Sequence, residues 1–207
     1  MCGVDGLTNF DFYTRPWSYA TVDGFLSREH FDRLIAYSNE LVIGREEKIF
    51  FSHKVSRDQI YQSDLFEDSF LIELYETYSE VLADYLSLAR PLKKFLVDYY
   101  DIALQVSGPD FEDKIHLDVP RKLVSGVVYL RSGIDGIGTL VFDEGGEHAN
   151  ESIVPWVDNR AMFFCRDQSS WHSYRGNGTD NRVTLTYNAC TRNHLIAKQL
   201  DKFRRFF

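Results

Sequence analysis

The sequence predicts a mainly β fold with supporting helices, and three observations lead to this prediction. Before Pro91 apolar residues recur at helical spacing, whereas after it they form short β-type runs separated by turn residues. Aromatic residues make up 15% of the chain, with 16 Phe and 12 Tyr, which favours a well-filled, β-rich core. The chain has 207 residues without an internal repeat or a linker-like tract, so residues 1–207 are expected to form a single domain.

Two helices are predicted in the first part of the chain from apolar stripes and end signals. After Leu26-Ser27, which offer a staple residue and an N-cap, apolar residues recur at near-helical spacing over Phe31–Leu41. A longer stripe covers about Glu67–Ala89, and Pro91 ends it because proline cannot continue a helix. Both helices are amphipathic, so residues 1–92 are expected to form mainly helical support for the rest of the domain.

The remaining elements are predicted as short strands followed by a last helix. Seven runs of β-type residues lie between turn signals, and this spacing predicts a sandwich, a jelly roll or a barrel over residues 93–191. Residues 192–207 are expected to hold a C-terminal helix, because Arg192–Arg205 carries apolar residues on one side. The seven predicted strands are Lys94–Tyr99, Ile102–Val106, Lys122–Arg131, Thr139–Asp143, Ile153–Val157, Ala161–Cys165 and Val183–Ala189.

Charge and composition exclude several classes of function. Asp and Glu (31) outnumber Lys and Arg (23), and the net charge of −8 repels phosphate backbones, so no nucleic-acid partner is expected. No apolar run approaches the roughly 18 residues of a membrane span, so no membrane partner is expected either. The three cysteines match neither a disulfide framework nor a zinc site, and Met1–Phe12 lacks an apolar signal-peptide core. These observations predict reduced thiols and a cytoplasmic location.

Three residues predict a metal site. His116-Leu117-Asp118 places an imidazole and a carboxylate two residues apart, and in extended chain both side chains project to the same face. His172 follows the apolar strand predicted at Ala161–Cys165. Two histidines and one carboxylate form the facial triad of non-haem Fe(II) oxygenases, which leaves coordination positions open. The structural alternative is a hydrogen-bonded pair at a strand end for His116 and Asp118, and a hydrogen-bonded core histidine for His172.

Arg182, ten residues after His172, predicts a second ligand. A 2-oxo acid with a distal carboxylate needs a buried cation as its anchor, and arginine offers a bidentate fork at a fixed distance from the metal. Thr184 lies two residues further on the same face of the strand and adds a hydroxyl donor. The structural alternative is an exposed arginine on an edge strand.

The stretch from about Asp101 to Thr191 resembles the catalytic core of the 2-oxoglutarate- and Fe(II)-dependent oxygenases, and it is most similar to the prolyl 4-hydroxylase-like group. The resemblance covers a little under half of the chain and departs from the family at Ile137-Gly138-Thr139, where members often have Gly-Gly. Tyr19–Ser27 also resembles the usual lead-in to the first supporting helix. The matching elements, in order, are His116-x-Asp118, Val127–Leu130, Gly138–Phe142, Asn159–Phe164, His172 and Arg182-x-Thr184.

This resemblance implies a double-stranded β-helix, a jelly-roll core braced by the N-terminal helices. It implies Fe(II) on the three metal-site residues, with 2-oxoglutarate and O2 as co-substrates. Tyr129 is implied to line the 2-oxoglutarate pocket near Arg182, although a core aromatic is an equal alternative, and Gln105 is the nearest candidate for a further co-substrate contact. Halogenating relatives replace the carboxylate with a small residue, so the presence of Asp118 makes hydroxylation the expected outcome.

The substrate is open at this stage. Three loops, Ser52–Asp68, Ser107–Lys114 and Asp143–Asn150, are expected around the mouth of the barrel, and the last two are acidic, which favours a basic or neutral substrate. A protein or peptide side chain is expected because of the resemblance, with a free amino acid or a small metabolite as alternatives. Two other functions stay open, namely a non-catalytic jelly-roll binding module and a cupin-like metalloenzyme that uses iron without 2-oxoglutarate.

The other histidines, tryptophans and cysteines are expected to be structural. A position at the surface is predicted for His30, His53, His148 and His194, packing for Trp156 and Trp171, and burial for Cys165 and Cys190.

Overall fold

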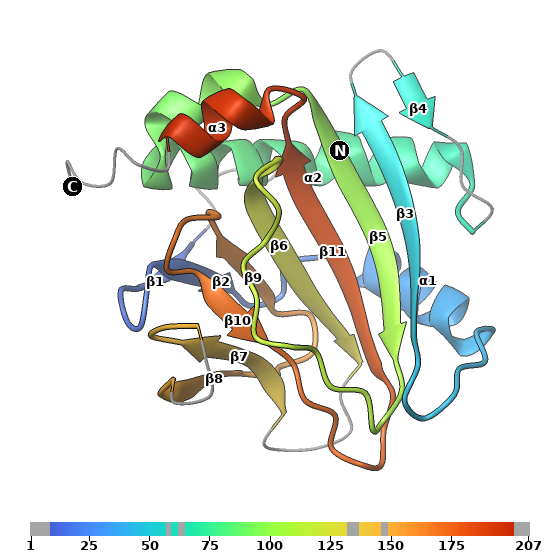
Figure 1. The fold of residues 1–207 in the computed structure, drawn as a ribbon. Helices are drawn as coiled ribbons and strands as arrows, with labels where there is room; N and C mark the ends of the chain where they lie inside the picture. The colour runs from blue at the N-terminus through green and yellow to red at the C-terminus, as the bar shows by residue number, and fades with distance from the viewer. Residues whose placement is uncertain (1–8, 57–58, 62–64, 132–136, 146–148, 201–207) are drawn as a thin grey trace.

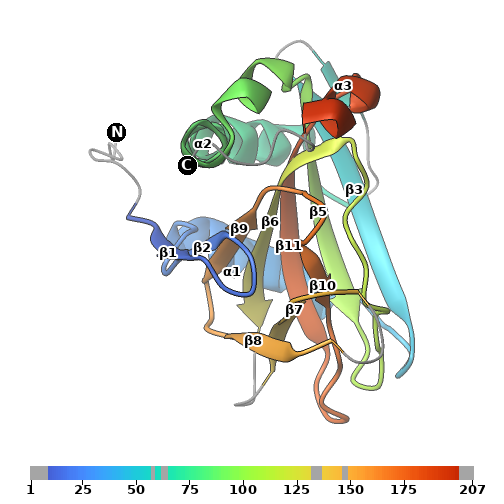
Figure 2. The ribbon, with the colours of Figure 1, turned by 60° about the vertical axis from the view of Figure 1, so that its left-hand side comes forward.

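Two antiparallel sheets and a layer of helices make up the computed structural model, which describes residues 9–56, 59–61, 65–131, 137–145 and 149–200. In Figure 1 the smaller sheet lies in front of the large sheet, and the long helix crosses behind the large sheet. The view in Figure 2 shows the same layers from the side. The helices are α1 (Arg28–Asn39), α2 (Asp68–Ala89), the 3-10 helix η1 (Pro91–Leu96) and α3 (His194–Leu200).

The large sheet has eight strands in the order β1-β2-β9-β6-β11-β5-β3-β4. Its centre is β11, which pairs antiparallel with β5 on one side and β6 on the other. The strands are β1 (Asp11–Tyr13), β2 (Tyr19–Val22), β3 (Lys48–Ser56), β4 (Gln59–Tyr61), β5 (Tyr99–Ser107), β6 (Lys122–Arg131), β9 (Ala161–Phe164) and β11 (Arg182–Cys190).

The smaller sheet has the order β10-β7-β8, with β7 at Gly138–Phe142, β8 at Glu151–Pro155 and β10 at Trp171–Ser173. Two isolated bridges, Glu112↔Arg175 and His116↔His172, place residues 112–116 beside β10 as a fourth line of this sheet. From β5 onward the chain passes repeatedly between the two sheets, as in a jelly roll. This topology confirms the predicted mainly β fold with supporting helices.

Side chains along the central strands point alternately toward the helices and into the space between the two sheets. On β11, Leu185 and Tyr187 belong to the apolar cluster shared with the helices. Arg182 and Thr184, at the alternate positions, line a cavity on the opposite face. Every residue of β11 is buried, because both faces of the strand are covered. The same strand therefore stabilises the core and supplies the site.

The start of α1 and the end of α2 agree with the predicted end signals, whereas α1 ends at Asn39, before Leu41 of the predicted stripe. Ser27 Oγ accepts a hydrogen bond from the backbone N–H of His30 at 3.2 Å, which satisfies one free donor at the start of α1. The longer helix ends at Ala89, and Pro91 begins η1. Fully buried residues such as Leu74 on α2 pack against the large sheet. No helix in the described part of the chain is long and apolar enough to cross a membrane.

Several boundaries differ from the sequence predictions. The predicted strand Lys94–Tyr99 is wrong over its first residues, because η1 continues to Leu96 and the strand begins at Tyr99. The predicted mouth loop Ser52–Asp68 is also wrong over its first part, because residues 48–56 form β3 and pair with β5. Residues 1–92 hold the two predicted helices but also contribute four strands to the large sheet. Residues 201–205 of the predicted C-terminal helix lie outside the described residues.

Candidate metal centre

His116, Asp118 and His172 come together in the space between the two sheets. One ligand atom from each residue lies within 4.8 Å of the others. The two histidines are brought into register by reciprocal backbone hydrogen bonds, His116 N to His172 O and His172 N to His116 O, each at 3.0 Å. Their ring centroids are 4.4 Å apart. The fold therefore brings His172 next to His116 and Asp118, as the sequence predicted.

Backbone carbonyls orient both imidazoles in the same way. His116 Nδ1 lies 2.8 Å from the carbonyl oxygen of Lys114, and His172 Nδ1 lies 2.9 Å from that of Ser170. Because a carbonyl only accepts, each Nδ1 carries the proton and each Nε2 keeps a free lone pair. Burial lowers the pKa of His172, against the opposing charge of Asp118, so the neutral form is favoured. A metal ligand needs this neutral form.

Asp118 is held as a carboxylate by two donors. Lys122 Nζ donates to Oδ1 at 2.7 Å and Ser125 Oγ donates to Oδ2 at 2.5 Å. Burial by itself raises the pKa of Asp118, but the charge of Lys122, the proximity of His172 and the Ser125 hydrogen bond outweigh it and lower the pKa well below its usual value. Two neutral imidazoles and one ionised carboxylate on one side of a cavity form a donor set that suits Fe(II).

The three residues line a cavity of about 330 Å³, whose other end is built from polar groups. Arg182 there is 6% exposed, and its guanidinium carbon lies 4.1 Å from the centre of the Tyr174 ring. Three buried atoms of the lining residues have no hydrogen-bond partner among the described residues: Tyr174 Oη, Arg182 Nε and Thr184 Oγ1. Ser107 Oγ, on the residue opposite Arg182 in the strand register, is likewise buried without such a partner. Buried polar groups are nearly always paired, so this cluster indicates an anionic, hydrogen-bonding ligand.

The predicted co-substrate residues lie on three neighbouring strands. Thr184 of β11 is opposite Gln105 of β5 and Tyr129 of β6. Gln105 and Thr184 line the cavity. The Tyr129 hydroxyl instead donates to Thr139 Oγ1 at 2.8 Å, and its ring stacks on Trp156 with centroids 4.4 Å apart. The side chain of Tyr129 is thus committed to packing beside the cavity, and its contact with a co-substrate stays a prediction.

Four residues of the site were missed in the sequence. Ser107, opposite Arg182 in the strand register, lies two residues after Gln105, and the cavity residue Tyr174 lies two residues after His172, so strand alternation was the signal that was available for both. Lys122 and Ser125 carried no such signal, because their contact with Asp118 depends on the path of the chain between residues 118 and 122.

Two histidines predicted at the surface are buried. His30 Nδ1 lies 2.7 Å from the Tyr78 hydroxyl, and its Nε2 lies 3.0 Å from Glu73 Oε1. His53 is fully buried against the Phe66 ring, and burial lowers its pKa to about 4. Both predictions failed because the neighbouring helices and β3 close over these positions. Other outcomes follow the predictions: His194 is exposed, and Cys165, Cys190 and Trp156 are buried. The predicted surface position of His148 lies outside the described residues.

The fold and the site together define a double-stranded β-helix with a two-histidine, one-carboxylate centre. Solved structures with this fold include a prolyl-4-hydroxylase from Pseudomonas putida (18% identity, TM-score 0.58), whose comparison covers 84% of this chain and 93% of that chain. An oxidoreductase of the 2OG-Fe(II) oxygenase family from Burkholderia pseudomallei is 14% identical, with a TM-score of 0.58 and coverage of 84% and 85%. The viral collagen prolyl hydroxylase of Paramecium Bursaria Chlorella virus-1, in its 2OG complex, is 15% identical, with a TM-score of 0.54 and coverage of 82% and 94%.

The sequence matches no family model and no curated protein. The likeness to the solved structures is therefore one of fold, and at that level it confirms the resemblance to the prolyl 4-hydroxylase-like group.

Proposed function

We propose that this protein is an Fe(II)- and 2-oxoglutarate-dependent dioxygenase that hydroxylates an unactivated C–H bond. One observation carries the proposal: a single cavity holds the two-histidine, one-carboxylate centre and, at its other end, a buried arginine surrounded by unpaired polar atoms. A structural metal site would need neither the second end nor the open cavity. The shared fold with oxygenase structures supports the same proposal.

His116, Asp118 and His172 would hold the iron. When bound, Fe(II) supplies the oxidative chemistry in which 2-oxoglutarate and O2 give succinate and CO2 and the substrate gains a hydroxyl group. The backbone carbonyls of Lys114 and Ser170 keep the two Nε2 lone pairs turned toward the metal. The iron site is thus preorganised by groups that the chain supplies itself.

The arginine end of the cavity would bind the distal carboxylate of 2-oxoglutarate. Arg182 offers a charged fork, and Ser107, Tyr174 and Thr184 add hydroxyl groups that lack partners without a ligand. Burial lowers the pKa of Arg182, but a guanidinium remains charged at neutral pH. Gln105 would face the co-substrate from β5. Burial away from water lowers the effective dielectric constant at this end and strengthens each of these charge-assisted bonds.

The substrate class of the hydroxylation is proposed from the solved structures that share the fold. Two of the solved structures are named prolyl hydroxylases, which favours a protein or peptide side chain, with a small molecule as the alternative. Neither substrate class requires a nucleic-acid or membrane surface.

Succinate formation tests the proposal. Iron-loaded protein under air is expected to convert 2-oxoglutarate to succinate, and His172→Ala is expected to lose that turnover because a ligand is missing. His194→Ala is the matched control, because His194 is exposed on α3. Equal turnover by wild type and His172→Ala would contradict the assignment. Stoichiometric iron binding without any turnover would instead favour the non-catalytic binding module.

A further inference from the structure

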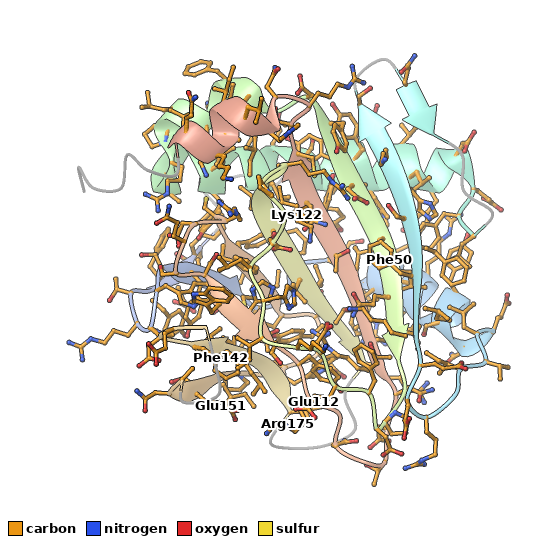
Figure 3. The ribbon with its side chains drawn as sticks, viewed as in Figure 1. Phe50, Glu112, Lys122, Phe142, Glu151 and Arg175 are labelled. Atoms are coloured by element: carbon orange, nitrogen blue, oxygen red, sulfur yellow. The ribbon has the colours of Figure 1, made fainter. Side chains whose placement is uncertain are left out.

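Lys122 is a cavity residue whose only role so far is its contact with the metal-site residue Asp118. It lies at the start of β6, four residues after Asp118, and its ammonium group donates to Asp118 Oδ1 at 2.7 Å. Its side chain is 22% exposed and lines the cavity. Figure 3 labels Lys122 at the start of β6 and Phe50, another lining residue, on β3. A cation therefore stands beside the carboxylate that would hold the metal.

The charges that line the cavity do not cancel. Among the lining residues Lys48, Lys122 and Arg182 are positive and Asp113 and Asp118 are negative, which leaves one net positive charge when the histidines are neutral ligands. The two positive charges of Fe(II) and the two negative charges of 2-oxoglutarate offset each other. The loaded cavity would therefore keep an excess of positive charge, which the carboxylate group of a ligand would offset where it lies.

Lys122 is the lining cation whose charge would be least compensated in the loaded site, because its only anionic partner among the described residues, Asp118, would also bind the metal. Lys48 Nζ is paired with Asp113 Oδ2 at 2.8 Å. Arg182 would pair with the distal carboxylate of 2-oxoglutarate, and the negative charge of Asp118 would be shared with the metal. Since a partly buried ammonium group that shares its one carboxylate with a metal is only partly compensated, the site favours a ligand that supplies a further anionic group near Lys122.

Polar side chains whose own hydrogen bonds are long lie at this end of the cavity. The strand register pairs Cys190 of β11 with Lys122 and Asn188 with Ser125, so the group lies at the opposite end of β11 from Arg182. Asn188 and Thr186 line the cavity and make only long contacts of 3.5 Å to backbone carbonyls. Such weakly bound donors are free to turn toward a ligand.

One further acidic group lies near Asn188 but is already engaged. Asp101 stands opposite Asn188 in the strand register and accepts a hydrogen bond from Ser52 at 2.6 Å. Asp101 is not among the residues that line the cavity. Its carboxylate is therefore not the anion that faces Lys122 across the open space.

We infer that Lys122 binds a carboxylate group of the substrate, assisted by Asn188 and Thr186, so that the substrate is a small carboxylic acid such as a free amino acid. This inference rests on the proposed function and favours its small-molecule alternative, because a residue inside a peptide has no free carboxylate beside its side chain.

The first test compares acids with their amides on the wild-type protein. The probes are the proteinogenic L-amino acids, the same compounds as carboxamides, and a proline-containing peptide blocked at both ends. Binding is measured by calorimetry on the Fe(II) and 2-oxoglutarate complex without oxygen, and succinate formation is measured under air. We expect at least one free acid to bind and to stimulate succinate formation, with its carboxamide weaker by roughly tenfold or more. Equal binding of acids and carboxamides, or a response to the blocked peptide alone, would overturn the inference.

The second test assigns the discrimination to Lys122. Lys122→Met is expected to bind the acid and its carboxamide almost equally, whereas Lys122→Arg keeps the charge and should keep a preference for the acid. Lys48→Met is the matched control, because it removes a lining lysine that is paired with Asp113. An unchanged preference in Lys122→Met, or its loss in Lys48→Met alone, would contradict the assignment.

Failure of this inference is distinguishable from failure of the proposed function. If the wild-type protein binds iron and 2-oxoglutarate and forms succinate but prefers the blocked peptide, only the carboxylate inference is wrong. If the wild-type protein forms no succinate with any probe and binds no 2-oxoglutarate, the proposed function itself is wrong. Thermal unfolding and metal titration of each variant show whether a change in binding reflects loss of the fold or of the metal.

Discussion

Replacing Arg182 by methionine tests whether the buried guanidinium binds the distal carboxylate of 2-oxoglutarate. Methionine keeps much of the length and the contact with the Tyr174 ring but removes the charge and the donors. Arg182 is 6% exposed, so water and salt screen its charge little. Its Nε has no partner within the described residues, so a ligand carboxylate would add hydrogen bonds and not replace existing ones.

The expected loss follows from the energetics of buried charge pairs. Removing one partner of such a pair costs about 2–5 kcal/mol, which corresponds to roughly 30-fold to a few thousand-fold in affinity. The three hydroxyl groups of Ser107, Tyr174 and Thr184 remain in the variant and retain part of the carboxylate binding. We therefore expect a loss of about 3 kcal/mol, or roughly a hundredfold in the Kd of 2-oxoglutarate.

The assay separates the distal carboxylate from the rest of the co-substrate. Calorimetry under anaerobic conditions measures the Kd of 2-oxoglutarate and of 2-oxopentanoate, which has a methyl group in place of the distal carboxylate. Wild type should prefer 2-oxoglutarate strongly, and Arg182→Met should lose most of this preference while its affinity for 2-oxopentanoate changes little. An equal loss of affinity for both acids would show that the guanidinium does not face the distal carboxylate. Unchanged affinity for 2-oxoglutarate would favour the cupin-like alternative.

Two further predictions concern the metal ligand and a buried histidine. Ser125→Ala removes the 2.5 Å hydrogen bond to Asp118 Oδ2. The affinity for Fe(II) or Co(II), measured by titration, should therefore fall roughly tenfold to a hundredfold. An unchanged affinity would show that Ser125 does not position the Asp118 carboxylate. His53 has a pKa of about 4 in the fold, mainly because it is buried and despite the charges of Asp101 and Asp68, so the unfolded chain binds its proton first as the pH falls. Its contribution to stability should be fully present above about pH 6.5 and decrease by about 3 kcal/mol as the pH falls to 4. Urea unfolding of wild type and His53→Leu between pH 7 and pH 4 checks this, and parallel pH profiles would contradict it.

Local patterns predicted the helices well, because the signals lie within the elements themselves. The apolar stripe of α2 and Pro91 after it specify where that helix lies and ends. The strands β1 to β4 were missed, because β3 is half-buried at the side of the sheet and its pairing with β5 is a contact between distant segments. The first residues of Lys94–Tyr99 were assigned wrongly for a related reason: a short run of apolar residues does not distinguish a strand from a helical turn.

The sequence by itself predicted which residues form the candidate site. His116, Asp118, His172 and Arg182 were identified from residue type, order and spacing, because ligand chemistry restricts which residues can serve. Spacing along the chain also placed Thr184 on the face of Arg182.

Only the tertiary structure decided what surrounds these residues. The β-bridge that joins His116 to His172, the unpaired hydroxyl groups of Ser107 and Tyr174, and the Lys122 ammonium group on Asp118 all depend on strand register and on the path of the connecting loop. Contacts of this kind form between residues that are far apart in the sequence or separated by irregular chain, where no local periodicity reports them. The physical reason is that a side chain's chemistry is local, whereas its electrostatic environment is set by the whole fold.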